Sequence, residues 1–518
     1  MKTPPRIVLM PGNNALIDAR VMKNLRAAAA LGYDAIALGI SRGESIHDEV
    51  LPTGGRVIVQ PITLRDEARK QFPAWRFSYD RTERSIARAY VKYLVGEVNR
   101  DAQRAARDAT RQPTITGPHP RRPGPLATQR RRLHALVMRV IVKARSLRAD
   151  REIKRDAMDP VKLEAWRRRR FALLRLTPWR ARWRAYLPKA VDEMIDIGPR
   201  LDELEPDIVH VHDVYLMAAA ARYAQRAHAR GHPVRLVYDA HEFVAGLTHV
   251  PPKRVVAYSR MEREFIGDFD RVVTVSDSLA DLLVQAHHLA RRPDVVLNAP
   301  ILDTTTPQVP SVRQAAGVAP GVPLLVYSGV VNPARGVGTA VEALPLLEGA
   351  HLALIVNNRG TAVRHLEQVA AGLGVADRLH LVPFVPHDQV VRYMASADVG
   401  LSPLSHAVNH DVALTNKFCE YIEAGLAVVT SDTPEQARLV RELDLGEVFV
   451  ADDAADLARA VRLALERRVE IGRRIQGDSA LLHRFSWAAQ AEVLARVYAD
   501  ELAVLRDQPP GAGGESGQ

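Results

Sequence analysis

Hydrophobic residues fall into short continuous runs that are followed by longer segments of helical period. The runs are rich in Val, Ile and Leu and do not alternate with polar residues, which is typical of strands covered on both faces. In the first half they are RIVLM (6–10), DAIALGI (34–40), RVIVQPI (56–62), DIVHVHD (207–213), RLVYDAHE (235–242), RVVTVS (271–276) and DVVLNAP (294–300). In the second half they are PLLVYSG (323–329), HLALIVN (351–357), LHLVPFV (379–385), VGLSPL (399–404), AVVTSD (427–432) and GEVFV (446–450). The alternation predicts parallel sheets with right-handed connections.

The pattern divides the chain into two α/β domains, each Rossmann-like and doubly wound. The break falls at Leu302–Val322, which has no strong period. We therefore expect a first domain over 1–305, a second over 306–485, a helix over 486–506 and a disordered tail over 507–518. Two such domains leave a cleft between the carboxyl ends of their strands, where open α/β sheets bind ligands.

Positive charge is concentrated in one insertion of the first domain, at about 76–190. That segment holds 31 Lys and Arg against 10 Asp and Glu, although the whole chain is only +11. It predicts a basic, mostly helical insertion, in which Arg and Trp mix near residues 166–188. Two interpretations are equally open: solvated charge, and binding to an anionic membrane surface through 130–190. Nucleic acid is the less favoured partner.

Composition narrows the class of protein. Hydrophobic residues make up 47% and charged residues 25%, as in an ordinary globular protein. The single Cys419 excludes an intrachain disulfide framework and a Cys-rich zinc module. Prolines 4 and 5 interrupt the N-terminus where a signal peptide has its apolar core, so the cytoplasm is the expected compartment.

Polar motifs follow several of the predicted strands. They are HVHD (210–213), YDAHE (238–242), YSGVVNPARG (327–336) and LTNKFCEYIEAGLAVVTSD (414–432). His210 and His212 share a strand face and, with Asp213, are candidate zinc ligands. No further His/Asp cluster follows at the strand ends in the order of a metallohydrolase, so a packing or acceptor-side role is the preferred interpretation.

These motifs and their order resemble the family 4 retaining glycosyltransferases of the GT-B fold. The likeness runs from Arg6 to Leu505, except for Arg76–Ala190. It is carried by DARVMKNLRAAAALGYDAIALG near the start, VVTVSDSLADLL followed by VVLNAP, NKFCEYIEAG, and the closing FSWAAQAEVLARVY. The resemblance implies that the helix over 486–506 crosses back onto the first domain.

The resemblance implies a nucleotide-diphosphate sugar as the donor and an acceptor hydroxyl that receives the sugar with retained configuration. An anionic leaving group needs cations or helix N-termini aimed at the diphosphate. The expected catalytic residues are His241, which lies against the sugar in the family, and Glu420, whose carboxylate accepts from the ribose hydroxyls. The expected donor-binding residues are Asn13, Arg335, Gly336, Phe384, Val385, Asn416, Lys417 and Glu420.

Two departures from the family pattern change the expected site. Val412 stands where the family often has the first Glu of a Glu-x7-Glu pair, so His410 and Asp411 become the candidate sugar contacts. Val330 stands where an Arg usually follows the strand glycine, which leaves Arg335 and Lys417 to hold the diphosphate.

The predicted activity is a hexosyltransferase-like transfer without a metal, and with no cofactor besides the nucleotide-sugar co-substrate. Expected products are a cell-surface polysaccharide, a glycolipid or a glycoconjugate, and a lipid-linked acceptor at the inner face of the plasma membrane remains open. Two alternatives belong to other classes. One is a nucleotide-sugar epimerase of the same architecture, and the other is a non-catalytic scaffold that binds lipid or nucleic acid.

Overall fold

The structure is a computed structural model of the whole chain. It describes residues 4–41, 45–62, 183, 187–248, 250–302, 310–356 and 360–507. The predicted basic insertion, apart from Trp183 and residues 187–190, lies outside the described residues, as does the tail from residue 508 on.

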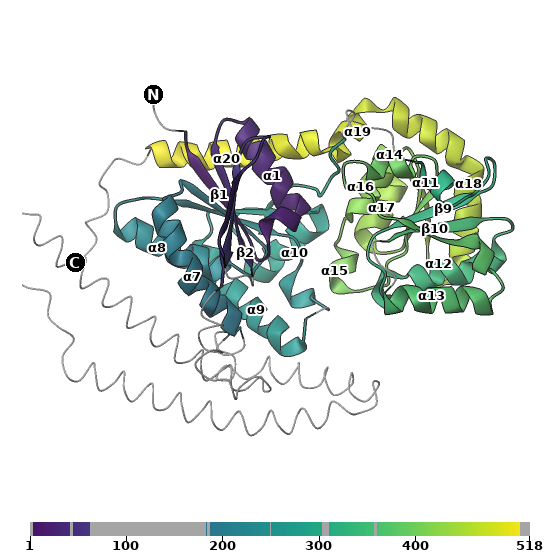
Figure 1. Cartoon of the computed structure of the whole chain (residues 1–518), viewed down its shortest axis with the longest axis horizontal. Helices are drawn as coiled ribbons and strands as arrows, with labels where there is room; N and C mark the ends of the chain where they lie inside the picture. Colours follow the sequence, from purple (N-terminus) through teal and green to yellow (C-terminus); the bar gives the residue numbers. More distant parts are fainter. Residues whose placement is uncertain are drawn as a thin grey trace, which may run out of the picture.

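The first domain is built on an eight-stranded sheet (Figure 1). Its strands are β1 (Arg6–Pro11), β2 (Asp34–Ser41), β3 (His47–Val50), β4 (Arg56–Pro61), β5 (Ile208–His212), β6 (Arg235–Ala240), β7 (Arg271–Thr274) and β8 (Asp294–Val295). They lie in the order β3-β4-β2-β1-β5-β6-β7-β8, and all neighbours are parallel except β3 and β4. The carboxyl ends of the parallel strands therefore meet along one edge of the sheet.

Helices cover both faces of this sheet. They are α1 (Ala19–Ala30), α7 (Pro188–Leu204), α8 (Met217–Ala229), α9 (Pro252–Phe265) and α10 (Asp277–His287). Helices α7 to α10 pack on one face, where Met10 and Val211 of the strands meet Leu201 and Met217. On the other face, Leu9 packs in a second cluster, which includes residues of α1 and residues near the C-terminus. Burial on both faces explains why the strands are continuously apolar.

The second domain has a fully parallel six-stranded sheet, in the order β11-β10-β9-β12-β13-β14. Its strands are β9 (Leu324–Ser328), β10 (His351–Val356), β11 (Leu379–Pro383), β12 (Val399–Ser402), β13 (Ala427–Ser431) and β14 (Gly446–Phe449). Its helices are α11 (Val312–Ala315), α12 (Val337–Ala343), α13 (Thr361–Gly372), α14 (Val390–Met394), α15 (Val408–Asp411), α16 (Asn416–Glu423), α17 (Pro434–Glu442), α18 (Ala454–Gly477) and α19 (Ser479–Phe485). One continuous hydrophobic core fills this domain.

The last helix, α20 (Trp487–Asp507), returns from the second domain to the first (Figure 1). Its Leu494, Val497 and Tyr498 are buried in the same cluster as Leu9 of β1. At its start the Trp487 amide donates to the Pro300 carbonyl at 3.1 Å. The C-terminal helix thus packs against the sheet of the first domain.

The prediction of two Rossmann-like, doubly wound domains is confirmed. Two details differ from the sequence prediction. Strand β3 was missed because its residues HDEV are all exposed and form no apolar run. The run at 294–300 supplies only two strand residues in β8, and the rest continues without regular structure.

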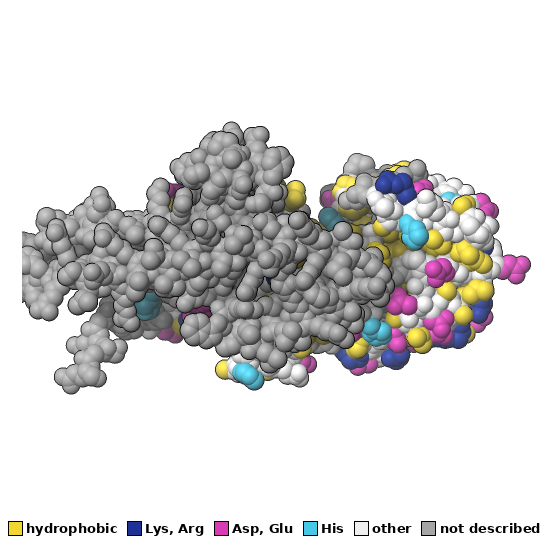
Figure 2. Space-filling model, turned by 90° about the horizontal axis from the view of Figure 1, so that it is seen from below, with side chains coloured by type: hydrophobic (Ala, Val, Ile, Leu, Met, Phe, Trp, Pro, Cys, Tyr) yellow, Lys and Arg dark blue, Asp and Glu magenta, His cyan; other side chains and the backbone are white. Residues whose placement is uncertain are grey.

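No helix among the described residues is both long enough and apolar enough to span a membrane. On the face of the second domain shown in Figure 2, acidic, basic and apolar side chains are interspersed.

Candidate functional site

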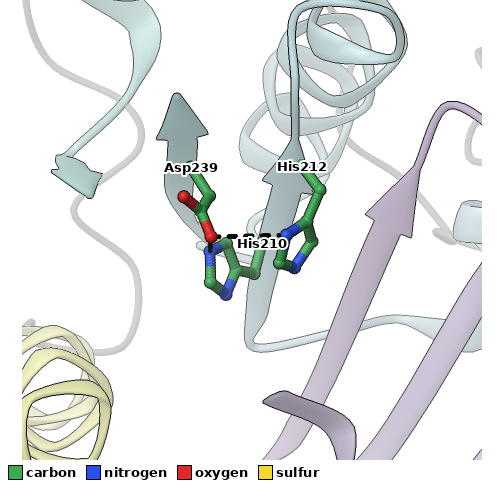
Figure 3. A group of neighbouring side chains, drawn as sticks. All are labelled: His210, His212 and Asp239. Carbon is green, nitrogen blue, oxygen red and sulfur yellow. Dashed lines mark ion pairs between the residues drawn. The ribbon is translucent and has the colours of Figure 1, made fainter. Parts of the chain in front are cut away.

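The first half of the site lies where β5 and β6 end. The two strands are parallel neighbours, and His212 lies opposite Asp239. His210 and His212 are two residues apart on β5 and therefore point to the same face, where they stack at 4.4 Å between ring centroids. Figure 3 shows both rings beside Asp239. His212 Nδ1 lies 3.3 Å from the Asp239 carboxylate, and all three side chains are at most 1% exposed.

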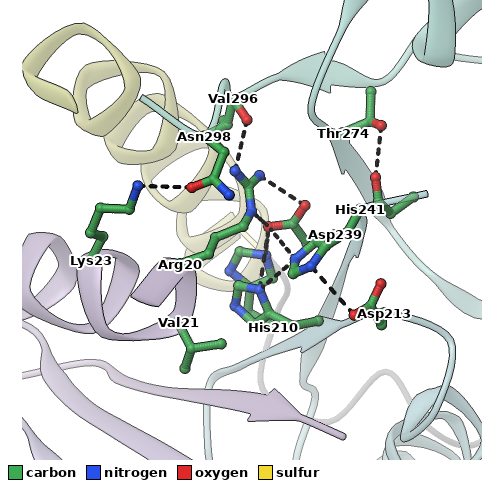
Figure 4. A network of polar contacts seen from close by, with 12 residues as sticks. Arg20, Val21, Lys23, His210, Asp213, Asp239, His241, Thr274, Val296 and Asn298 are labelled. Carbon is green, nitrogen blue, oxygen red and sulfur yellow. Dashed lines mark hydrogen bonds and ion pairs between the residues drawn. The ribbon is translucent and has the colours of Figure 1, made fainter. Parts of the chain in front are cut away.

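A buried arginine completes this cluster. Arg20 of α1 donates to both Asp239 carboxylate oxygens, at 2.8 and 2.9 Å, and to the Val296 carbonyl at 2.9 Å (Figure 4). Burial alone would raise the pKa of Asp239, but Arg20 and the neighbouring His241 hold it well below its usual range. Asp239 is therefore an ionised carboxylate in the interior of the protein, and its charge is matched by the guanidinium.

His241 follows β6 and is held between two carboxylates. Its Nδ1 lies 3.4 Å from Asp213, and its Nε2 lies 3.6 Å from Asp239 and 3.2 Å from His212 Nδ1. Burial would lower the pKa of His241, but the two carboxylates raise it to about 10. Burial instead lowers the pKa of His212 and takes that of His210 well below the usual range. At neutral pH the cluster contains one imidazolium, at position 241, and two neutral imidazoles.

Asp213 reaches His241 from an uncommon backbone conformation. Its φ of 61° lies in the left-handed region, which costs a non-glycine residue about 1–2 kcal/mol. Its side chain is 35% exposed, in contrast to the buried Asp239. The end of β5 therefore presents a half-exposed carboxylate beside the imidazolium.

The histidine pair and Asp239 also meet the geometric requirement for a metal site. Their ligand atoms lie within 4.8 Å of one another. However, the Arg20 guanidinium already engages both Asp239 oxygens, and His210 Nδ1 lies 2.8 Å from the Tyr498 hydroxyl. A divalent cation would have to displace one cation and sit beside another at His241. The group does not fit a metal, and the sequence candidate Asp213 contacts His241 instead.

The second half of the site lies at the carboxyl end of β9. Gly329 follows the strand with a φ of 132°, and Gly336 has a φ of 66°. A Cβ at Gly336 would overlap the Pro403 carbonyl oxygen, so only glycine fits there. Asn332 accepts a hydrogen bond from the Arg335 amide at 3.1 Å, which closes the short turn before Gly336. This turn fixes the half-buried Arg335 next to the start of α16.

Lys417 is the second residue of α16 and is only 8% exposed. Its Nζ lies 5.0 Å from the Tyr327 ring centroid and 3.6 Å from the place where a Cβ on Gly329 would lie. Burial, and then the nearby Arg335, lower the pKa of Lys417 to about 7. Among the described residues, no ion pair joins Lys417 or Arg335 to a carboxylate. The two cations thus form a positive site beside the amino end of a helix.

Glu420 lies one turn further along α16 and is also 8% exposed. Burial raises its pKa, and Lys417 and Lys23 oppose that rise. Lys23 belongs to α1 of the first domain, so a charge of that domain affects the pKa of Glu420. Asn416 is exposed at the start of the helix, whereas Cys419 is buried in the core. The helix therefore places an amide, a cation and a carboxylate within one and a half turns.

The remaining candidates surround these two halves. Phe384 is 44% exposed and contacts His387 edge-on, whereas Val385 is buried. His410 donates from Nδ1 to the Ser405 carbonyl at 2.8 Å, and its pKa is lowered by burial and by Arg335 and Lys417. Asp411 is paired with His406 at 2.7 Å.

Asn13 is exposed in the loop after β1, and its amide donates to Asp18 at 2.9 Å. Of the predicted residues, the structure brings Arg335, Lys417 and His410 together, with Glu420 one turn away on α16.

Sequence reasoning missed the contributions of α1. Arg20 and Lys23 both stand in the segment that carried the family resemblance, three residues apart and therefore on one side of a helix. Lys23 donates to the Asn298 side chain at 2.8 Å and to the Ala299 carbonyl at 2.6 Å. Two basic residues one turn apart in the predicted first helix were the available signal, but their partners lie more than 200 residues away.

Replacing His241 by alanine should lower turnover more than donor binding. The reason is that the imidazolium lies between the carboxylates of the first domain, whereas Arg335 and Lys417, the candidate ligands of a diphosphate, belong to the second. We expect kcat to fall by about 10²-fold or more, as when a positioned charged group is lost, with donor affinity within about threefold of the parent. Kinetics and calorimetry on the same preparation provide the comparison. Turnover equal to that of the parent would make His241 a structural residue.

Both halves of the chain are similar to known proteins. A family model described as "Glycosyltransferase Family 4" matches residues 126–301, and one described as "Glycosyl transferases group 1" matches residues 322–467. A D-inositol 3-phosphate glycosyltransferase from Mycolicibacterium gilvum is 27% identical over 319 residues, which are 57% of this chain and 66% of that protein. A glycogen synthase from Mycobacterium tuberculosis is also 27% identical, over 59% of this chain and 73% of its own length.

Solved structures share the fold. A sucrose-phosphate synthase from Thermosynechococcus elongatus superposes with a TM-score of 0.60 at 14% identity, covering 96% of this chain and 100% of that one. A glycosyltransferase from Rickettsia africae gives a TM-score of 0.54 at 10% identity, covering 98% and 100%. The matches to both halves, in the same order and on the same pair of parallel sheets, lead to one conclusion: the chain belongs to glycosyltransferase family 4 and has the GT-B fold.

Proposed function

We propose that this chain is a retaining, metal-independent hexosyltransferase that moves a sugar from a nucleotide-diphosphate donor to an acceptor hydroxyl. The observation that carries the proposal is the pair of cations Arg335 and Lys417. Burying an ammonium costs free energy unless an anion compensates it, and the lowered pKa of Lys417 reflects that cost. A diphosphate bound between the two would supply the missing negative charge.

The chemistry follows from where charge develops. When the bond between the anomeric carbon and the phosphate oxygen breaks, negative charge grows on the diphosphate and positive charge grows on the sugar ring. Arg335, Lys417 and the amino end of α16 stabilise the former. The acceptor hydroxyl attacks from the face that the diphosphate leaves, and its proton passes to a phosphate oxygen. Configuration is retained, and no covalent link to the enzyme forms.

The first domain contributes side chains that ion pairs hold in place beside the proposed site. Asp239 is held by two bonds from Arg20, so its carboxylate is not free to act as a nucleophile. His241 is held as an imidazolium between Asp239 and the half-exposed Asp213. We assign His241 to contact with the transferred sugar, with His410 approaching it from the second domain. Asp411 is already bound to His406, which makes His410 the stronger candidate of the two.

The nucleoside half of the donor is assigned to Glu420 and to the segment after β11. The carboxylate of Glu420 would accept from the ribose hydroxyls, and Phe384 would lie beside the base. A solved structure with a TM-score of 0.52, described as "Trehalose-6-phosphate from E. coli bound with UDP-2-fluoro glucose", has the same fold. UDP-sugars are therefore the first donors to test.

Names of relatives do not determine the acceptor. At the same 27% identity, one relative is named for inositol 3-phosphate and another for glycogen synthesis. We propose a role in polysaccharide, glycolipid or glycoconjugate synthesis at the cytoplasmic side of the membrane. Most of the basic segment 130–190, which would bind an anionic surface, lies outside the described residues, and that interaction stays a prediction.

The activity is tested with a panel of UDP-, GDP- and TDP-sugars. Thermal shift identifies the donor, and mass spectrometry identifies transfer to water or to an added acceptor. Ligand at about 100 times its dissociation constant should stabilise the protein by about 2.7 kcal/mol. NMR of the product reports the anomeric configuration, and an excess of EDTA should leave the rate unchanged. A change of sugar stereochemistry without any acceptor would favour an epimerase instead, and no response to any donor would favour a scaffold.

Replacing Glu420 by glutamine should weaken donor binding by about tenfold. One charged acceptor for ribose is lost, and a hydrogen bond to a charged group is worth about 1.5–3 kcal/mol, part of which the amide retains. Calorimetry with the identified donor measures the change. The nearby buried Glu423 replaced by glutamine is the control, because it lies on the same helix without a place in the assigned site. Unchanged affinity in Glu420→Gln would remove that residue from the donor site.

A further inference from the structure

The short helix α15 lies between the two domains. It begins after Ala407 and ends at Asp411, and it joins the end of β12 to the start of α16. Its residues contact Phe243 and Gly246 of the first domain, which makes it part of the interface between the two domains.

One contact is a hydrogen bond across the interface. The Phe243 amide of the first domain donates to the Asn409 side-chain oxygen of α15 at 2.8 Å. Phe243 is two residues after His241 and precedes the short turn Val244–Gly246. The side-chain oxygen of Asn409 therefore holds the segment that carries the imidazolium.

Packing supports that bond on both sides. A Cβ at Gly246 would lie 3.0 Å from the Val408 Cβ and 3.3 Å from the Asn409 side-chain carbon, so the turn and the helix are in direct contact. Val412, directly after α15, packs against the hydrophobic core of the first domain, and its carbonyl accepts from the Ser276 hydroxyl at 2.5 Å. The position where a carboxylate is usual in the family is here an apolar contact between domains.

The next residue of the same helix belongs to the donor side. His410 is held to the Ser405 carbonyl at 2.8 Å, and its pKa is lowered by burial and by the cations Arg335 and Lys417. Within a four-residue helix, position 409 contacts the first domain, and position 410 bonds to Ser405, whose amide donates to the Ala334 carbonyl next to Arg335 at 3.2 Å. A movement of one cannot leave the other in place, because both lie on one hydrogen-bonded turn.

We propose that Asn409 is a positioning residue that couples closure of the two domains to the placement of His410 in the donor site. This inference rests on the proposed function, because only that function identifies the site beside His410 as a donor site. In the closed form the bond from Phe243 sets α15, and with it His410, at the distance that transfer needs. In the open form α15 loses this constraint, and the donor is bound without being committed to reaction.

The test compares Asn409→Ala with Asn409→Asp. An aspartate oxygen accepts from the Phe243 amide as the asparagine oxygen does, whereas alanine cannot. For the alanine variant we expect kcat for transfer to fall by about three- to tenfold, as for one lost hydrogen bond, with the dissociation constant for UDP-glucose within about twofold of the parent. The aspartate variant should keep the parental kcat. Gln225→Ala, an exposed amide on α8, is the matched control.

A second measurement does not depend on activity. Spin labels at His228→Cys on α8 and Gln368→Cys on α13, both exposed positions, report the distance between domains, and the single native Cys419 is buried. Asn409→Ala and Gly246→Val should both broaden this distance toward longer values. Gly246→Val acts from the opposite side of the contact, by placing a side chain against Val408.

The outcomes separate the two hypotheses. A parent protein that binds and turns over no nucleotide sugar overturns the proposed function, while the label distances still test the interface. The coupling is overturned if Asn409→Ala keeps full turnover, if the aspartate variant is as impaired as the alanine variant, or if the distance distribution is unchanged in both interface variants.

Discussion

Replacing Arg20 by methionine is expected to destabilise the protein by about 3–5 kcal/mol, the cost of leaving one partner of a buried ion pair alone. Arg20 is 3% exposed and Asp239 is fully buried. Without the guanidinium, the carboxylate keeps neither of its two arginine hydrogen bonds and no longer has that cation to offset its burial. Thermal and urea unfolding measure the change.

The stability of this variant should depend less on acid pH than the stability of the parent does. In the parent the folded-state pKa of Asp239 lies well below its ordinary value of 3.8, so the pair stabilises the fold above that pH and the stabilisation is lost as pH falls. In Arg20→Met the arginine no longer lowers the folded-state pKa of Asp239 while His241 still does, so this pKa should rise relative to the parent and less stability should be lost as pH falls.

The matched control is the double variant Arg20→Met with Asp239→Leu. Removing both charges of a buried pair is often neutral or stabilising, so the double variant should recover most of the loss. A single variant with the unfolding midpoint of the parent would show that the pair does not hold the first domain together.

Replacing Lys417 by methionine should have opposite effects on donor binding and on stability. Without the ammonium, a developing phosphate charge loses its closest buried cation, and donor affinity should fall by about 100-fold, or about 3 kcal/mol. The unliganded protein should become more stable, because the cost of burying the ammonium disappears. We expect a gain of roughly 1 kcal/mol or more near pH 6, which is roughly 2–4 °C in unfolding midpoint per kcal/mol for a domain of this size.

The lowered pKa of Lys417 fixes the sign of two pH effects. The folded-state pKa is about 7 against 10.5 for the free side chain, so the unfolded state holds more protons between these values and stability rises with pH in that window. Donor binding requires the ammonium, so affinity should fall as pH rises above about 7, by at most about tenfold per pH unit for one proton. Both trends should be absent in Lys417→Met.

Calorimetry with UDP-glucose or the donor identified by screening, at several pH values, measures the binding effect, and calorimetric unfolding without ligand measures the stability effect. The control is Lys23→Met. That lysine also has a pKa lowered to about 7, but it bonds to Asn298 and Ala299 rather than facing Arg335. If Lys417→Met binds the donor as the parent does, the diphosphate is not held where we place it.

Much of the architecture was predictable because its causes are local. Continuous apolar runs such as 324–328 and 427–431 form buried parallel strands since both faces of each sheet are covered. The exposed strand β3 gave no such signal. Its HDEV sequence pairs with β4 through backbone hydrogen bonds, while its side chains remain in solvent.

The candidate site was predictable only in part. The sequence located Arg335, Lys417 and Glu420 through their spacing in motifs that resemble a family. It did not reveal Arg20 as the partner of Asp239, because the two are 219 positions apart and a charge on a helix is more often solvated than buried. It also did not reveal that Val412 packs against the other domain.

The sequence by itself therefore determined the two doubly wound domains and the family, since hydrophobic period and motif order are properties of the chain. Only the tertiary structure decided which charges face one another. It pairs Arg20 with Asp239, places His241 between two carboxylates and leaves Lys417 beside Arg335. The physical reason is that a side chain's protonation state and partners depend on burial and on distances of a few ångströms, which exist only after the two sheets and α20 are assembled.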